Sequence, residues 1–185
     1  MCWLPILERL LPAKGKQLNR FLSITVATAI LAPVMATLAS GLALAQGALP
    51  DPARTPGAVN SEVTQETIGA TICVRGWTRT IRPPAQYTSA LKRQQIRAWG
   101  YENQRMTEYE EDHLIPLGIG GAPYDEDNLW PQPLVTADSW DAVHKDRLES
   151  VLNRLVCSGR LSLAEAQAAI ADDWTVAYVR YVLGE

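Results

Sequence analysis

The sequence predicts an α+β fold in which two short strands lie among amphipathic helices. Residues 109–117 and 129–131 are short segments on either side of a glycine-containing loop, which is typical of a pair of strands. Residues 138–156 and 162–181 carry helix caps and apolar residues at helical spacing. Since strands and helices are both expected, the chain belongs to a mixed class.

The first 45 residues have the features of a secretory leader. Residues 1–21 carry four basic side chains, and residues 22–45 carry no charge. That run ends in Ala43-Leu44-Ala45, the small-x-small pattern that signal peptidase recognises. We therefore expect a signal peptide at 1–45 and a periplasmic or secreted protein with no stable membrane association after cleavage. The alternative is a retained membrane anchor, because the run is long enough to cross a bilayer.

The rest of the chain is long enough for one domain with a hydrophobic core. Residues 46–62 are rich in Pro, Gly and Ala and show no apolar period, so they are expected to be a flexible lead-in. No repeat or long low-complexity tract divides residues 63–185. The sequence thus predicts a single domain over 63–185, of undefined oligomeric state.

The first half of this domain is expected to contain a helix, a β segment and a second helix. Residues 63–70 suit a short helix. Residues 71–81 alternate apolar and polar side chains and are rich in β-branched residues, which predicts an N-terminal strand or hairpin ended by Pro83-Pro84. Residues 88–99 suit a helix that ends at Gly100.

The second half is expected to contain the strand pair and two longer helices. The first strand carries Asp112-His113 on it or at its end. The helix at 138–156 would have Asp138 as its N-cap and Asp141 at its third position. The helix at 162–181 opens with a Ser-x-x-Glu capping box and carries one apolar stripe, which predicts a long C-terminal amphipathic helix packed on the core.

Two cysteines, Cys73 and Cys157, follow the leader. An even number of cysteines in an exported domain favours a disulfide between them. A zinc site is the poorer interpretation, because neither cysteine has the paired C-x-x-C spacing of a structural zinc knuckle.

Charge is distributed unevenly along the chain. Beyond residue 45 there are 13 basic and 19 acidic residues. Residues 67–101 nevertheless contain six basic residues and no acidic one, interleaved with aromatic side chains, which is typical of a surface that contacts phosphates. The candidates for nucleic-acid contacts are Arg75, Arg79, Arg93, Arg97 and, from the acidic second half, Lys145. The alternative is that these side chains are solvated faces of ordinary elements, and that Lys145 pairs with Asp141 or Glu149.

The pair Asp112-His113 is the strongest indication of chemistry. An imidazole accepts a proton near neutral pH, and an adjacent carboxylate is suited to a hard cation. The sequence contains no G-x-S-x-G elbow, P-loop, Rossmann glycine pattern or H-E-x-x-H motif. A metal-assisted hydrolase is therefore the favoured class.

The order of these residues resembles the HNH, or ββα-metal, endonucleases. The matching positions are Asp112-His113, the four residues 114–117, Gly120-Gly121 and the run 127–129, Asp-Asn-Leu. The string is also similar to a group of small exported bacterial proteins that share a K-D-x-x-E element, here residues 145–149. The resemblance covers about residues 106–150 and implies a ββα-metal (HNH-like) core with flanking helices.

The resemblance implies a role for each matching residue. His113 would be the general base that activates water, and Asp112 would ligate a divalent metal ion. Asn128 would brace the loop and help to orient the histidine. The second ligand departs from the family pattern, and Asp141 and His144 are both candidates, with Asp138 a third. Asp141 suits Mg or Mn, which are favoured, whereas His144 suits Zn or Ni or is simply a surface residue.

Two functions follow from these expectations. The first is an exported metal-dependent endonuclease that hydrolyses phosphodiester bonds, with DNA, RNA or both as its nucleic-acid substrate. The second is a non-catalytic exported binding domain built on an HNH-like scaffold. The C-x-x-C zinc clamp of many HNH enzymes is absent, so a bridge between Cys73 and Cys157 would brace the fold instead.

Overall fold

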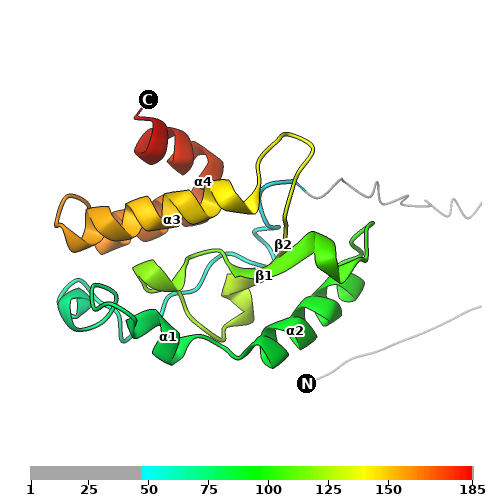
Figure 1. Cartoon of the computed structure of the whole chain (residues 1–185), viewed down its shortest axis with the longest axis horizontal. Coiled ribbons are helices and arrows are strands. Elements are labelled where there is room, and N and C mark those ends of the chain that lie inside the picture. Colours follow the sequence, from blue (N-terminus) through cyan, green and yellow to red (C-terminus); the bar gives the residue numbers. More distant parts are fainter. Residues whose placement is uncertain (1–46, 185) are drawn as a thin grey trace, which may run out of the picture. The chain divides into compact units, whose positions relative to one another are not determined.

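A two-stranded antiparallel sheet lies at the centre of the chain in a computed structural model that describes residues 47–184 (Figure 1). Its strands are β1 (Tyr109–His113) and β2 (Leu129–Pro133). Helix α2 (Ala85–Ala98) lies on one side of the sheet and α3 (Ala142–Cys157) on the other. This arrangement confirms the α+β class and the two predicted strands.

The register of the strands decides which side chains face each helix. Asp112 pairs with Trp130, and His113 at the end of β1 pairs with Leu129. Because successive side chains of a strand point to opposite faces, Asp112 lies on the face toward α3, while Glu111 lies on the other face. Residues 114–128 connect the strands and contain two 3-10 turns, η3 (Leu117–Ile119) and η4 (Glu126–Asn128).

The main hydrophobic core lies between α3 and α4 (Leu163–Tyr178). Each helix contributes fully buried side chains, among them Leu148 and Leu152 from α3 and Ile170 from α4. The predicted capping box is present: Ser162 Oγ accepts from the Glu165 backbone, and the Glu165 carboxylate accepts from the Ser162 backbone. The C-terminal amphipathic stripe is thus used for packing, as expected.

The last helix is not continuous. Asp173 has extended backbone angles inside α4, and its carboxylate accepts from the backbone of Thr175 and Val176, which starts a new helical turn. A π-helical segment, η5 (Val179–Leu183), follows directly. Within residues 47–184, no helix combines the length and the apolar character needed to span a bilayer.

The prediction of an N-terminal β segment at residues 71–81 is wrong. Residues 71–81 form turns followed by a short helix, α1 (Trp77–Ile81), and the helix expected at 63–70 is reduced to one 3-10 turn, η1 (Ile68–Ala70). Gly76 adopts a left-handed φ of 86°, which interrupts an extended run. The alternating pattern therefore meets no partner strand, and Thr80 instead donates its hydroxyl to Trp77 O one helical turn earlier.

The start of α3 also differs from the prediction. The N-cap is Asp141, whose carboxylate accepts from the backbone of His144 at 2.9 Å. Asp138, the expected cap, accepts instead from the hydroxyl of Thr136 in the preceding loop. Ser139 has a positive φ of 67°, so the chain turns between the two aspartates before the helix begins.

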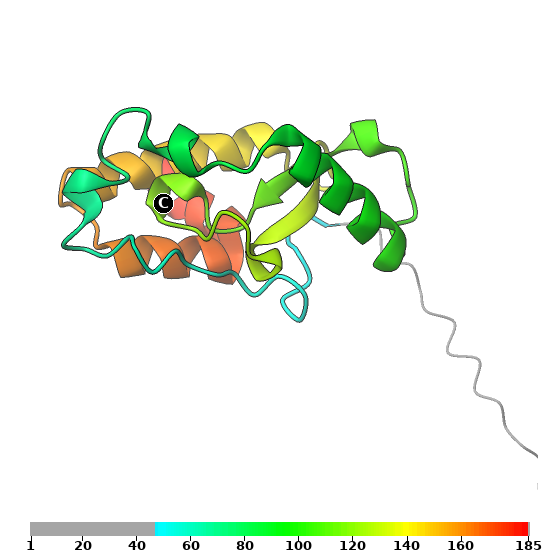
Figure 2. The same ribbon diagram turned by 90° about the horizontal axis from the view of Figure 1, so that it is seen from below.

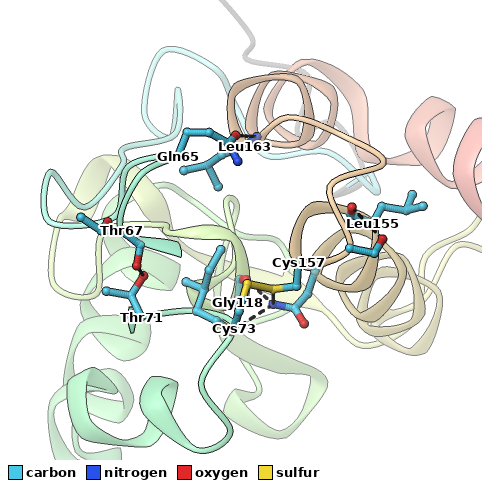
Figure 3. The surroundings of a disulfide bond; sticks show 11 residues. Gln65, Thr67, Thr71, Cys73, Gly118, Leu155, Cys157 and Leu163 are labelled. Carbon is cyan, nitrogen blue, oxygen red and sulfur yellow. Dashed lines mark hydrogen bonds between the residues drawn. A yellow bond between two sulfur atoms is a disulfide. The ribbon is translucent and has the colours of Figure 1, made fainter. Parts of the chain in front are cut away.

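The predicted disulfide between Cys73 and Cys157 is confirmed (Figure 3). It joins the turn before α1 to the last residue of α3 across 84 positions of sequence. In the chain-entropy model, closing a loop of this length stabilises the fold by roughly 4–5 kcal/mol. The bridge replaces the strand pairing that the sequence predicted for this segment.

The segment expected to be a flexible lead-in runs along the domain (Figure 2) and makes specific contacts with it. Gly57 N donates to Asp127 O, and Asn60 N donates to Gly120 O, both at 2.8 Å. The indole of Trp174 donates to Ala48 O. Residues 47–62 thus follow the loop between the strands, and the predicted leader at 1–45 lies outside the described residues.

Candidate active site

His113 is the buried last residue of β1, and its side chain is held in one tautomer. Its Nε2 lies 3.0 Å from Pro123 O, and a carbonyl oxygen only accepts, so Nε2 carries the proton. Among the described residues, no group hydrogen-bonds to Nδ1, which keeps its lone pair. Burial is the main cause that lowers the pKa of His113, and the positive charge of Arg82 adds to it. The ring is therefore neutral near pH 7, as a general base must be.

Asn128 fixes the loop that follows His113. Its Oδ1 accepts from Ile115 N at 2.9 Å, and its Nδ2 donates to Ile115 O and Ala122 O at 3.0 and 3.1 Å. Its backbone oxygen accepts from Leu114 N at 2.8 Å. The side chain is fully buried and contacts no solvent. Asn128 is therefore a positioning residue that holds the backbone directly after the histidine.

Gly121 is required for this brace. A Cβ added at this position would lie 1.7 Å from Ile115 O and 2.8 Å from Asn128 Nδ2. Any side chain would therefore displace the Ile115 carbonyl and the Asn128 amide, which are hydrogen-bonded to each other. The glycine pair in the sequence pattern is explained by this close approach of backbone and amide.

Asp112 forms an ion pair with Lys145 of α3. The ammonium nitrogen lies 2.5 Å from Asp112 Oδ2, 2.5 Å from Glu149 Oε1 and 2.9 Å from His113 O. These three acceptors match the three protons of an ammonium group, which is 1% exposed. Burial alone would lower the pKa of Lys145, but the two carboxylates outweigh it and hold that pKa above its usual value. Lys145 is therefore charged, and each of its three ammonium protons has an acceptor.

Asp141 and His144 lie at the other side of α3, in a separate cluster. The His144 ring nitrogen Nδ1 is 2.6 Å from Asp141 Oδ1. The ring packs edge-on against Trp140 and Tyr178, with centroids 5.4 and 5.2 Å away. The structure therefore does not bring either residue to Asp112. Within residues 47–184, no group of three His, Cys, Asp or Glu side chains is arranged to hold a metal ion.

The donor set around Asp112 suits a hard cation in its chemistry. Asp112 and Glu149 both place a carboxylate oxygen against one positive nitrogen, so their oxygens converge on one cation. Carboxylate oxygens are the ligands that Mg²⁺ and Mn²⁺ prefer. Glu149, rather than Asp141 or His144, is the α3 residue whose carboxylate binds the same ammonium as Asp112. The sequence signals for it were its spacing of four from Lys145 and its place in the K-D-x-x-E element.

The predicted phosphate-binding residues occupy different places. Arg75 is exposed at the turn before α1, and Arg79 is exposed on α1. Arg93 and Arg97 are exposed on α2, where they line a separate shallow depression. Lys145 is buried in its ion pair and is not free to contact a phosphate. Sequence reasoning did not single out Arg82, whose charge acts on His113.

Comparisons of this chain with models of known protein families, with curated proteins and with solved structures find no match. The site must therefore be interpreted from its own geometry. It combines a neutral, oriented imidazole with an adjacent carboxylate, at the point where a strand meets a tightly braced loop. Such an arrangement can take a proton from water beside a bound cation.

Proposed function

We propose that the chain is an exported metal-dependent endonuclease that hydrolyses phosphodiester bonds of DNA or RNA, built on a ββα-metal core of the HNH type. The observation that carries the proposal is the fixed tautomer of His113, whose Nδ1 has no hydrogen-bond partner among residues 47–184 and which directly follows Asp112 in β1. The order β1, braced loop, β2, α3 supports it, because it matches the order of that core.

Each residue of the candidate site has its own role in the proposed hydrolysis. His113 Nδ1 accepts a proton from the attacking water, and the hydrogen bond from Nε2 to Pro123 O keeps the ring in place as the proton arrives. Asn128 holds the backbone beyond the histidine. Asp112, with Glu149, would hold a divalent ion. When bound, such an ion neutralises charge on the phosphate and on the leaving oxygen.

Export is supported by the disulfide, because such bonds persist in oxidising compartments. The leader-like sequence at 1–45 agrees with it. A thiol-alkylation assay on the protein recovered from cells checks this part of the proposal: the two cysteines are expected to react only after reduction.

One observation favours the alternative, a non-catalytic binding domain on the same scaffold. Lys145 already supplies a positive charge to both Asp112 and Glu149, which a divalent ion would otherwise supply. A protein that had lost its metal could keep its fold through this ammonium. The two functions differ in whether nucleic acid is cut.

The test is a cleavage assay on the protein purified after expression of the full chain. Supercoiled plasmid DNA and single-stranded RNA are each incubated with Mg²⁺, Mn²⁺, Zn²⁺ or Ni²⁺, and with EDTA. We expect cleavage with Mg²⁺ or Mn²⁺, loss of cleavage in EDTA, and loss in Asp112→Asn. If neither nucleic acid is cut with any metal, the endonuclease proposal fails and the binding domain is favoured.

A further inference from the structure

A groove of about 650 Å³ lies between residues 72–82 and the C-terminal half of α3. One wall is the turn and helix from Ile72 to Arg82, and the other is the face of α3 from Glu149 to Ser158. Its floor is the loop at Pro116–Gly118, which directly follows the stretch that Asn128 braces. The groove was not apparent from the sequence, because its first wall was predicted to be a strand.

The groove is positively charged on both walls. Arg75 and Arg82 line one wall and Arg154 lines the other, and all three side chains are exposed. None of them forms an ion pair with a carboxylate among residues 47–184. The lining has these three arginines against one acidic residue, Glu149, which also pairs with Lys145. The groove therefore presents a net positive surface to a ligand.

The groove leads to the candidate active site. Glu149 lies at its edge and, through Lys145, is joined to Asp112. The positive charge of Arg82, which lines the groove, also contributes to lowering the pKa of His113. A polyanion that lies along the groove would therefore reach the residues proposed to cut it.

The walls of the groove are fixed relative to each other. The Cys73–Cys157 disulfide joins them at one end (Figure 3). Asn153 Nδ2 donates to Gly118 O at 2.7 Å and to Ile72 O at 3.4 Å, which ties the floor and the opposite wall to α3. A preformed site loses less conformational entropy when its ligand binds.

The chemistry of the lining selects a phosphate backbone over bases. Guanidinium groups make charge-assisted, bidentate hydrogen bonds to phosphate oxygens. In the described part of the chain, the lining contains no aromatic side chain, and stacking on aromatic rings is how bases of single strands are usually held. Contacts to phosphates position a nucleic acid but do not report its sequence.

We propose that this disulfide-braced groove binds the phosphodiester backbone of nucleic acid without sequence preference, through Arg82 and Arg154 on its two walls with Arg75 beside them. The proposal deepens the endonuclease assignment and rests on it for the direction in which the strand runs toward His113. The arginines of α2 supply a matched control. Arg93 and Arg97 carry the same charge and are also exposed, but they line a different depression.

Binding is measured by fluorescence anisotropy, in EDTA and with the His113→Ala substitution in every protein, so that no strand is cut. The probes are labelled 20-nucleotide duplex DNA, single-stranded DNA and RNA, each in two unrelated sequences. Adding Arg82→Ala and Arg154→Ala together is expected to weaken binding about tenfold or more on both sequences and to lower the salt dependence by about two phosphate contacts. Adding Arg93→Ala and Arg97→Ala together is expected to change binding less than about twofold.

The proposal is overturned if the groove substitutions leave the affinity unchanged, or if the α2 substitutions weaken binding as much. The three probes separate the sources of the backbone, because the single-stranded RNA and DNA backbones differ only at the sugar and the duplex probe adds the double-stranded form. Binding is measured without cleavage, so the two proposals can fail separately. If the groove substitutions weaken binding but no metal-loaded protein cuts nucleic acid, the endonuclease proposal fails and the groove proposal stands. If the groove substitutions leave binding unchanged while the unsubstituted protein cuts, the groove proposal fails and the endonuclease proposal stands.

Discussion

Helix α3 carries two polar clusters that differ in what they face. At its first turn, His144 binds Asp141 and packs against Tyr178 of α4. One residue further on, Lys145 turns to β1 and binds Asp112 and Glu149. Adjacent residues of a helix are separated by about 100° around its axis, so neighbours in sequence serve different neighbours in space. The first cluster caps and packs the helix, and the second joins it to His113.

The largest expected effect comes from removing the cation of the second cluster. Lys145→Met leaves Asp112 and Glu149 together without a counter-charge, and we expect the free energy of unfolding to fall by about 3–5 kcal/mol. Urea denaturation in EDTA measures it. His144→Ala, the matched change in the first cluster, removes one hydrogen bond and edge-on ring contacts and should cost about 1 kcal/mol. Equal losses would show that the two clusters do not differ.

The brace behind His113 is expected to be nearly as sensitive. Asn128→Ala removes three buried hydrogen bonds and leaves backbone groups of Ile115 and Ala122 unpaired, which should cost about 2–4 kcal/mol. Gln167→Ala is the control, because it removes a single hydrogen bond to Ile119 O of the same loop. Thermal unfolding of both variants compares them. A loss for Asn128→Ala no larger than that for Gln167→Ala would contradict its role.

The other face of β1 sharpens the contrast with Asp112. In the described structure, neither carboxylate oxygen of Glu111 has a hydrogen-bond partner, although both are buried. Burial raises the pKa of Glu111 to about 8, the charges of Asp112 and Glu126 add to it, and Lys92 opposes it. The folded state therefore holds this proton more tightly than the unfolded state, so stability falls as pH rises from about 4.5 to about 8.

We therefore expect Glu111→Gln to raise the free energy of unfolding of the metal-free protein more at pH 8 than at pH 5, with a difference on the order of 2 kcal/mol. Melting temperatures in EDTA at the two pH values provide the measurement. Glu108→Gln serves as the control, because Glu108 pairs with the exposed Arg105. A Glu111→Gln effect that is the same at both pH values would mean that this carboxyl titrates normally.

The smallest effect is expected at the helix cap. Asp141→Ala removes the N-cap of α3 and should lower the free energy of unfolding by about 1 kcal/mol. Because Asp141 does not contact Asp112, cleavage at a temperature well below unfolding should stay within about twofold of the unsubstituted rate. If Asp141→Ala lost as much cleavage activity as Asp112→Asn, the prediction would be wrong and Asp141 would be a candidate metal ligand again.

The elements near the site were largely predictable from the sequence, because their signals are local. The strand at Asp112-His113, the return at Leu129 and the capping box at Ser162 each depend on neighbouring residues, and each is present. The pairing of Cys73 and Cys157 followed from their number alone. Helix α2 begins three residues earlier than expected, with Pro84 at its N-cap.

The rest depended on contacts between distant segments. The alternating pattern at 71–81 predicted a strand, but a strand needs a partner, and the disulfide and the left-handed Gly76 place this segment against α3 instead. Spacing put Asp141 and His144 on one face of α3 but did not reveal that this face meets Tyr178. Lys145 was predicted to contact phosphate. Its burial between Asp112 and Glu149 could not be predicted, because it depends on β1 lying opposite α3.

The most direct test of the account is a parallel cleavage assay of His113→Ala and His144→Ala, because the chain has only two histidines. Both variants are assayed on supercoiled plasmid DNA and single-stranded RNA with Mn²⁺, at equal concentrations of folded protein. We predict that His113→Ala cuts at least about 100-fold more slowly, since it lacks the general base, and that His144→Ala cuts within about threefold of the unsubstituted protein. Equal rates in the two variants would contradict this prediction.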